Sequence, residues 1–180
     1  MELFSNKSKN LNVVVIQYDV ILKNQNININ KINMLFDLNT QLLKDIDLLV
    51  FPEMCLTGYE FIDTNDIFDF CDKIYYNISN NNSVENFKSL DYCLNYNTAL
   101  ELALKYDSNI LFGFPEAKLN ENLIQNINEL SNIDYCNIKN YKFYNSVYYI
   151  DRKGKIINII QKHFLYETDK VILIICKNKH

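Results

Sequence analysis

The chain has 180 residues, of which 48% are hydrophobic, 22% charged and 13% aromatic, and its formal net charge is −4 at pH 7. This length and composition favour one domain with a buried core and exclude a chain that is disordered throughout. The acidic balance argues against a nucleic-acid-binding protein, because such proteins carry a surplus of positive charge.

The first part of the chain predicts a strand, a helix and a second strand. Residues 13–17 are a short apolar run ending at Gln17, which is typical of a strand buried on both faces. Apolar residues then recur with a 3.6-residue period and predict an amphipathic helix over 28–45. Residues 47–51 repeat the buried-strand pattern. The order strand, helix, strand predicts an α/β fold.

The rest of the chain predicts a second helix and further strands. Residues 60–90 are mixed in character and include an Asn/Ser stretch, so we expect an irregular segment there. A helix is predicted through Ala99 to Tyr106, and a long polar loop is expected over 117–140. The remaining predicted elements are a buried strand at 109–114, a strand at 143–150, a turn at 151–154 in which Gly154 takes positive φ, and a return strand at 155–161.

Two charged residues stand at strand ends, where α/β sheets bind ligands. Glu53 follows the strand 47–51 and Pro52, and its apolar neighbours predict a pKa raised toward the range of a general base. Lys162 ends the return strand between apolar residues and would act as a fixed cation beside an oxyanion. The alternatives are a solvated loop glutamate and a surface lysine whose stem lies on apolar neighbours.

The five cysteines and two histidines predict neither a disulfide framework nor a zinc site, because the cysteine count is odd and no CxxC pair occurs. We therefore expect a reducing compartment, the cytoplasm or the nucleus. Neither a signal peptide nor an apolar run of membrane-spanning length is found, so no membrane partner is expected.

Two cysteines are candidate nucleophiles because they stand near strand ends. Cys55 lies two residues past Glu53, where we expect it to pack as a small hydrophobic residue, and Cys176 follows the apolar run 171–175. Glu53 and Lys162 together would supply the base and the cation that a nucleophilic cysteine needs. His163 suggests a Cys–His pair, but no carboxylate that would orient it is evident.

In chain order, these segments resemble the nitrilase superfamily of carbon–nitrogen hydrolases over about residues 11–169. The matching segments are 13–17, 47–59 (DLLVFPEMCLTGY), 109–116 (NILFGFPE), 144–154 (YNSVYYIDRKG) and 161–165 (QKHFL). The resemblance implies the N-terminal part of an α-β-β-α sandwich, with an extension at 1–10 and an unmatched tail at 170–180. It also implies Glu53 as general base and Lys162 as oxyanion stabiliser, with no metal or organic cofactor.

Residues 56–61 and 162–169 are similar to the protein N-terminal amidase branch. This branch removes ammonia from the side chain of an N-terminal Asn or Gln, which feeds the N-degron pathway, so the implied partners are such protein N-termini or a small amide. The Leu-Thr-Gly-Tyr part is also similar to the glutaminase domain of NAD synthetases, whose genes encode an ATP-pyrophosphatase domain downstream. The oligomeric state stays open.

The spacing of the nucleophile departs from the family pattern. The family places its cysteine tens of residues after the lysine, whereas Cys176 follows Lys162 by only 14 positions. We expect the chain to be a fragment or an incorrect gene model that is inactive in this form. The alternatives are that Cys176 is a displaced nucleophile, or that the chain is a non-catalytic interaction protein.

Overall fold

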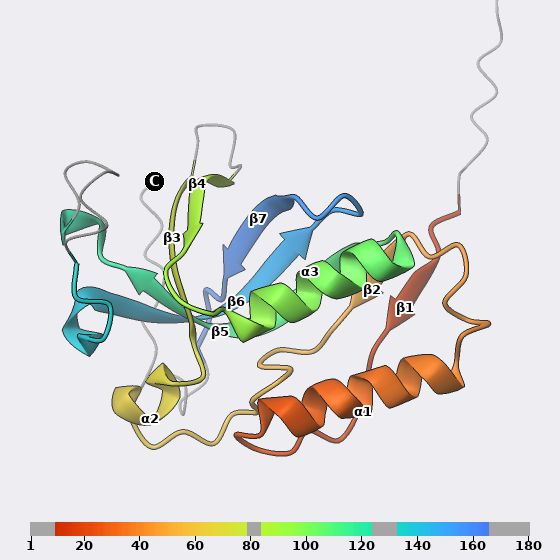
Figure 1. The fold of residues 1–180 in the computed structure, drawn as a ribbon, viewed down its shortest axis with the longest axis horizontal. Helices are drawn as coiled ribbons and strands as arrows, with labels where there is room; N and C mark the ends of the chain where they lie inside the picture. Colours follow the sequence, from red (N-terminus) through yellow and green to blue (C-terminus); the bar gives the residue numbers. More distant parts are fainter. Residues whose placement is uncertain (1–9, 79–83, 124–132, 166–180) are drawn as a thin grey trace, which may run out of the picture.

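A computed structural model describes residues 10–78, 84–123 and 133–165, and its described part contains one mixed sheet of seven strands with helices against it (Figure 1). The fold class is α/β, as predicted. The helical elements are α1 (Gln25–Leu38), α2 (Thr64–Phe68), α3 (Leu94–Tyr106) and the short 3-10 turns η1 (Glu121–Leu123) and η3 (Ile138–Asn140). The strands are β1 (Val13–Val15), β2 (Leu48–Val50), β3 (Asp72–Ile78), β4 (Val84–Ser89), β5 (Asn109–Leu119), β6 (Tyr141–Ile150) and β7 (Ile156–Gln161).

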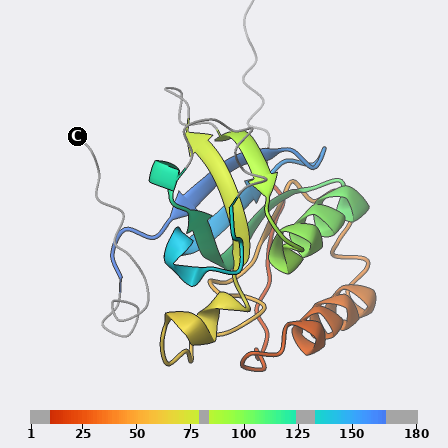
Figure 2. The ribbon, with the colours of Figure 1, turned by 60° about the vertical axis from the view of Figure 1, so that its left-hand side comes forward.

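The long strand β5 organises the sheet. Along one edge, its first residues pair in parallel with β2 and its last residues pair in parallel with β3. Along the other edge, β6 runs antiparallel to it over ten residue pairs, and β7 runs antiparallel to β6. β1 pairs with β2, and β4 pairs with β3 and approaches β7 (Figure 2). β2 ends with Val50 opposite Leu111 of β5, and β7 ends with Gln161 opposite Ser146 of β6, which itself pairs with Phe114 of β5.

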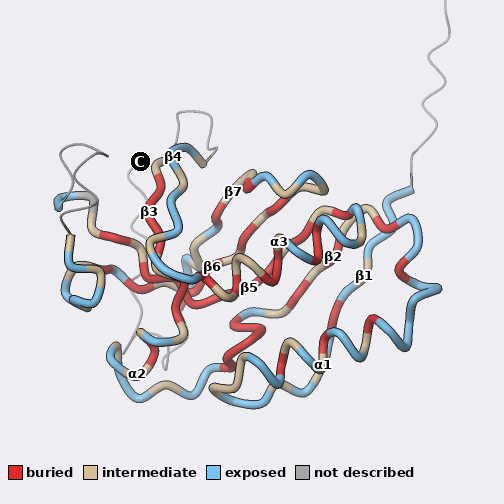
Figure 3. The backbone as a smooth tube through the Cα atoms, in the orientation of Figure 1, coloured by how far each residue is buried: buried red, intermediate tan, exposed pale blue. Residues whose placement is uncertain are grey.

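Helices α1 and α3 cover one face of the sheet, and α2 covers part of the other face. The rings of Phe36 in α1 and Tyr106 in α3 meet edge to face at 5.0 Å, and Phe36 also contacts Phe51 at the end of β2. Phe68 of α2 contacts Tyr141 and Phe143, whose side chains point to the opposite face of β6. The buried stretches concentrate on β5 and β6 (Figure 3), which places the core at the centre of the sheet.

The prediction of an irregular segment over 60–90 was wrong. Its described part contains α2 and the β3–β4 hairpin, and Asp63 caps α2 by accepting hydrogen bonds from the backbone N–H groups of Asn65 and Asp66. The polar residues in β3 and β4 obscure the alternation of apolar and polar residues that would predict a strand. Tertiary contacts place these two segments in the sheet. The predicted loop over 117–140 was wrong at its start, since β5 continues to Leu119.

The first strand was also interpreted wrongly. β1 is an edge strand within the described part of the chain, and it leaves Val13 and Val15 exposed instead of burying both faces. Helix α1 begins three residues before its predicted start, where Asn24 accepts a hydrogen bond from the N–H of Ile27, and ends at Leu38 instead of residue 45. Leu43 and Ile46 are buried beyond the helix, which explains why they extended its apolar pattern.

The hairpin of β6 and β7 was predicted correctly. Gly154 has φ +82° and donates its N–H to the carbonyl of Asp151, which closes the turn that the sequence indicated. The pairing of β6 with β7, in which Ser146 lies opposite Gln161, places Lys162 directly after the end of β7. No helix in the described ranges is long and apolar enough to cross a membrane.

Candidate active site

The segment after β2 crosses directly over Gly113 of β5. The N–H of Phe51 still bonds to the carbonyl of Leu111, and the N–H of Cys55 bonds to the carbonyl of Gly113, at 2.8 and 3.1 Å. Between these two bonds, Pro52 has no N–H to contribute to the ladder. A Cβ on Gly113 would lie 2.3 Å from the Pro52 carbonyl oxygen, so only glycine admits this crossing. The crossing places Glu53 above the middle of β5.

A tight turn then brings the chain back toward Glu53. Met54 has a φ of 47°, uncommon for a residue with a side chain, and its carbonyl accepts hydrogen bonds from the N–H groups of Thr57 and Gly58. Gly58 has φ +69°, which glycine adopts without strain. The turn returns the hydroxyl of Tyr59 to the carboxylate of Glu53, to which it donates a hydrogen bond.

Glu53 and Lys162 meet although 109 positions separate them in the chain. The Nζ atom of Lys162 lies 2.9 Å from Oε2 of Glu53. The same oxygen accepts a hydrogen bond from Nδ2 of Asn145 at 2.9 Å and the bond from Tyr59. Three donors from three separate segments therefore converge on one carboxylate oxygen, which fixes the orientation of the side chain.

The predicted direction of the Glu53 pKa was wrong. Burial raises the pKa of Glu53, but hydrogen bonds from Tyr59, Lys162 and Asn145, together with the charge of Lys162, outweigh burial and leave the pKa below its usual value. The side chain is 46% exposed, so burial is only partial. Glu53 is consequently ionised at neutral pH, the state in which a carboxylate accepts a proton.

Lys162 is held by the strand that precedes it. Its backbone N–H donates to the carbonyl of Asn145 at 2.8 Å, which continues the β6–β7 ladder by one residue. Its side chain is 26% exposed, and its Nζ lies 5.9 Å from the centre of the Tyr59 ring. The lysine therefore faces the carboxylate of Glu53 instead of extending along the surface.

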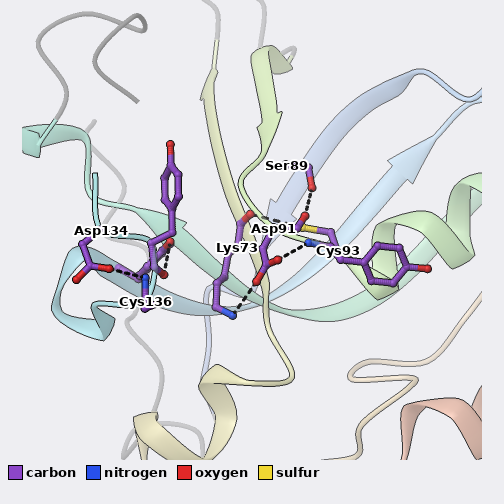
Figure 4. Close-up of polar contacts among 9 residues, drawn as sticks. Lys73, Ser89, Asp91, Cys93, Asp134 and Cys136 are labelled. Atoms are coloured by element: carbon purple, nitrogen blue, oxygen red, sulfur yellow. Dashed lines mark hydrogen bonds and ion pairs between the residues drawn. The ribbon is translucent and has the colours of Figure 1, made fainter. Parts of the chain in front are cut away.

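The described cysteines differ in their surroundings. Cys55 is fully buried, as predicted, and burial raises the pKa of its thiol. Burial also raises the pKa of Cys71, and it raises that of Cys93 to about 12. The Cys93 thiol donates to the Lys73 carbonyl, and exposed Cys136 donates its backbone N–H to Asp134 (Figure 4). Cys176 lies outside the described residues.

His163 is exposed, and its Nδ1 lies 3.3 Å from the carbonyl oxygen of Gln161. This local contact adds no support for a Cys–His pair. Within the ranges that the structure covers, no three His, Cys, Asp or Glu side chains are grouped so as to hold a metal ion.

Two residues of the site were not singled out from the sequence. Asn145 and Tyr59 stand inside the segments 144–154 and 47–59, but nothing in their spacing indicates that both would reach Glu53. The alternation of side chains along a strand would have placed Asn145 on the same face as Lys162 once the register of β6 and β7 was known.

The profile of the carbon–nitrogen hydrolase family matches residues 13–173. The chain belongs to the carbon–nitrogen hydrolase family. It is 33% identical over 155 residues to the protein N-terminal amidase of Schizosaccharomyces pombe. The aligned region covers 86% of this chain and 43% of that protein. The chain thus spans less than half the length of this relative.

Two solved structures share the fold. The crystal structure of an N-terminal amidase with a Gln-Gly peptide matches with a TM-score of 0.63 and 22% identity, over 89% of this chain and 29% of that chain. Saccharomyces cerevisiae Nit3, a member of branch 10 of the nitrilase superfamily, matches with a TM-score of 0.62 and 15% identity, over 93% and 49% of the two chains.

Proposed function

We propose that Glu53 and Lys162 are two parts of a site that hydrolyses a carboxamide and releases ammonia. The observation that carries the proposal is the 2.9 Å contact between Glu53 and Lys162 in a chain of the carbon–nitrogen hydrolase family. A carboxylate that stays ionised accepts the proton of a thiol, and the resulting thiolate attacks the amide carbon. The ammonium group of Lys162 stabilises the oxyanion that forms. Glu53 returns its proton to the amide nitrogen, the C–N bond breaks and ammonia leaves, and water hydrolyses the resulting thioester to the acid and the free thiol.

The substrate that we propose is the side-chain amide of an N-terminal Asn or Gln of a protein, in the N-degron pathway. Support comes from the similarity to the S. pombe protein N-terminal amidase and from the fold shared with an N-terminal amidase solved with Gln-Gly and Asn-Glu peptides. The partners are accordingly protein or peptide N-termini.

Two of the described cysteines are poorly suited to act as the nucleophile. Cys55 and Cys71 are buried, and burial raises the pKa of both thiols, which disfavours the thiolate. We infer that the 180-residue chain by itself does not hydrolyse the amide, because only eight residues, 163–170, separate Lys162 from the apolar run 171–175 that precedes Cys176, which leaves little chain to shape a pocket. The alternative is that Cys176 serves as a displaced nucleophile.

A chimera tests the proposed roles without depending on Cys176. Residues 11–165 of this chain replace the matching segment of the S. pombe relative, and ammonia release is measured from peptides that begin with Asn or Gln. We expect turnover by the chimera and its loss in Glu53→Gln and Lys162→Met variants. A peptide with an internal Asn serves as the substrate control. A folded chimera that retains activity in both variants would refute the assigned roles.

A further inference from the structure

The face of the sheet behind the site holds a buried carboxylate, Glu116 of β5, whose exposed fraction is 0%. Side chains alternate between the faces of a strand. Asn145 and Lys162 therefore point to the face that carries Glu53, whereas Ser146 and Gln161 point to the reverse face. Glu116 lies on this reverse face and is not in contact with Glu53 through any hydrogen bond of the described residues.

Glu116 joins β6 and β7 through their side chains. The hydroxyl of Ser146 donates to Oε2 of Glu116 at 2.5 Å. The amide Nε2 of Gln161 lies 3.2 Å from Oε1 and 3.1 Å from Oε2 of the same carboxyl group, and 3.1 Å from the hydroxyl oxygen of Tyr76. Burying a carboxyl group without hydrogen-bond partners destabilises the folded state. The hydrogen bonds of Glu116 therefore fix the positions of Ser146 and Gln161 as well as its own.

Two hydrogen-bond partners of Glu116, Ser146 and Gln161, are chain neighbours of site residues. Ser146 directly follows Asn145 in the chain, and Gln161 directly precedes Lys162. Ser146 and Gln161 are also paired across the β6–β7 ladder, and the next bond of this ladder joins the Lys162 N–H to the Asn145 carbonyl. A shift of Ser146 or Gln161 would therefore shift the peptide groups that carry Asn145 and Lys162.

We propose that Glu116 is a positioning residue, which clamps Ser146 and Gln161 from behind and thereby holds Lys162 and Asn145 against Glu53. Its importance for catalysis rests on the proposed function, because a positioned lysine matters only if that lysine stabilises an oxyanion. The contacts of Lys162 and Asn145 with Glu53 can be probed whether or not the chain hydrolyses a substrate.

Asp72 provides a matched control. It is paired with Glu116 in the β3–β5 register, is 1% exposed and is likewise bonded to a β6 hydroxyl, that of Tyr148 at 3.0 Å. Its other bonds come from Asn95 and Tyr96 at the N-terminus of α3. Replacing Asp72 therefore perturbs a buried carboxyl group of the same sheet without touching the residues adjacent to Asn145 and Lys162.

The experiment compares amine labelling of Lys162 in the 180-residue protein and in Glu116→Gln, Asp72→Asn and Glu53→Gln variants. Glutamine keeps the size of Glu116 but offers only one acceptor oxygen to Ser146 and Gln161. Pulses of reductive methylation are quantified by peptide mass spectrometry, with Lys153 in the hairpin turn as internal reference. Circular dichroism confirms that each variant is folded.

We expect Glu116→Gln to speed the labelling of Lys162 about fivefold, the scale of one lost ion pair, approaching the rate in Glu53→Gln. Asp72→Asn should leave the rate within about twofold of the unmodified protein, which is within the usual effect of a distant site. If Glu116→Gln does not fold, Ser146→Ala removes one contact of the clamp and should show the same change to a smaller extent.

Two results would overturn the proposal: an unchanged Lys162 rate in folded Glu116→Gln and Ser146→Ala proteins, or an equal increase in Asp72→Asn. The first would leave Glu116 with a structural role alone, and the second would indicate general loosening of the sheet. Labelling requires no turnover, so an inactive chimera would refute the proposed function without altering this result.

Discussion

A Cβ atom on Gly113 would lie 2.6 Å from the α-carbon of Glu53, closer than real Cβ atoms approach another carbon. The backbone of Glu53 therefore packs directly against the backbone of β5 at Gly113, which has no side chain to separate them. This contact sets the height of the carboxylate above the sheet, and with it the distance to Lys162.

Gly113→Ala should displace the segment 52–55 and weaken the Glu53–Lys162 contact. We expect a loss of about 1–3 kcal/mol in the free energy of unfolding, which is typical of overpacking. We also expect the pKa of Glu53 to rise toward its usual value, as measured by NMR titration of its carboxyl carbon. Gly154→Ala is the control, because its turn lies away from Glu53; it should destabilise the protein and leave the Glu53 titration unchanged. An unaltered titration in Gly113→Ala would contradict this account.

Removing the positive charge from Lys162 should raise the pKa of Glu53. In the folded protein this pKa is lowered, so the stabilisation from Glu53 is present above its unfolded-state pKa and is lost as pH falls through the folded-state pKa. In Lys162→Met, the decline of stability on acidification should therefore become shallower. Chemical denaturation at a series of pH values measures this, with the exposed Lys153→Met as control. An equally steep decline in Lys162→Met would argue against the ion pair.

Asp72 should produce the opposite pH dependence. Burial raises its pKa to about 6, against hydrogen bonds from Asn95, Tyr96 and Tyr148. The raised pKa means that the folded state favours the protonated form of Asp72. The contribution of protonated Asp72 to the free energy of unfolding is therefore complete below its unfolded-state pKa and is lost as pH rises through about 6. The stability of the unmodified protein relative to Asp72→Asn should fall by on the order of 1–3 kcal/mol between about pH 4 and pH 7. A pH-independent difference would show that Asp72 stays ionised in the folded protein.

The purified 180-residue chain should release no ammonia from Asn-initiated peptides at an enzymic rate. Three of the four described cysteines, Cys55, Cys71 and Cys93, are buried, and exposed Cys136 precedes Lys162 in the chain, whereas the family places its cysteine after the lysine. The spacing of Cys176 also departs from the family pattern. Ammonia is measured with Cys176→Ala as control. Turnover that disappears in this variant would establish Cys176 as a displaced nucleophile.

The outer edge of β1 should promote self-association, because no strand within the described ranges pairs with it and Val15 is 69% exposed. Val15→Lys should lower the apparent mass in concentrated solution, as measured by sedimentation. Ile62→Lys replaces a comparably exposed apolar residue outside the sheet and should have little effect. Equal effects of the two substitutions would point to general surface hydrophobicity instead of the strand edge.

The sequence by itself determined the elements whose patterns are local. The apolar runs at 47–51 and 109–114 predicted strands, the 3.6-residue period around Ala99 predicted a helix, and Gly154 marked the hairpin turn. The sequence also indicated Glu53 and Lys162 as candidate site residues, because both follow predicted strands and ligands bind at strand ends in α/β sheets.

Only the tertiary structure decided the β3–β4 hairpin, the edge position of β1 and the direction of the Glu53 pKa. Polar residues in β3 and β4 give no clear alternation, and whether a strand lies at an edge depends on which strands pair with it. The pKa of Glu53 depends on Asn145 and Lys162, which lie 92 and 109 positions away, and on Tyr59, which a turn brings back. Hydrogen bonds between distant segments set the charge of this carboxyl group, and such bonds follow from the register of β6 and β7, which composition and periodicity do not contain.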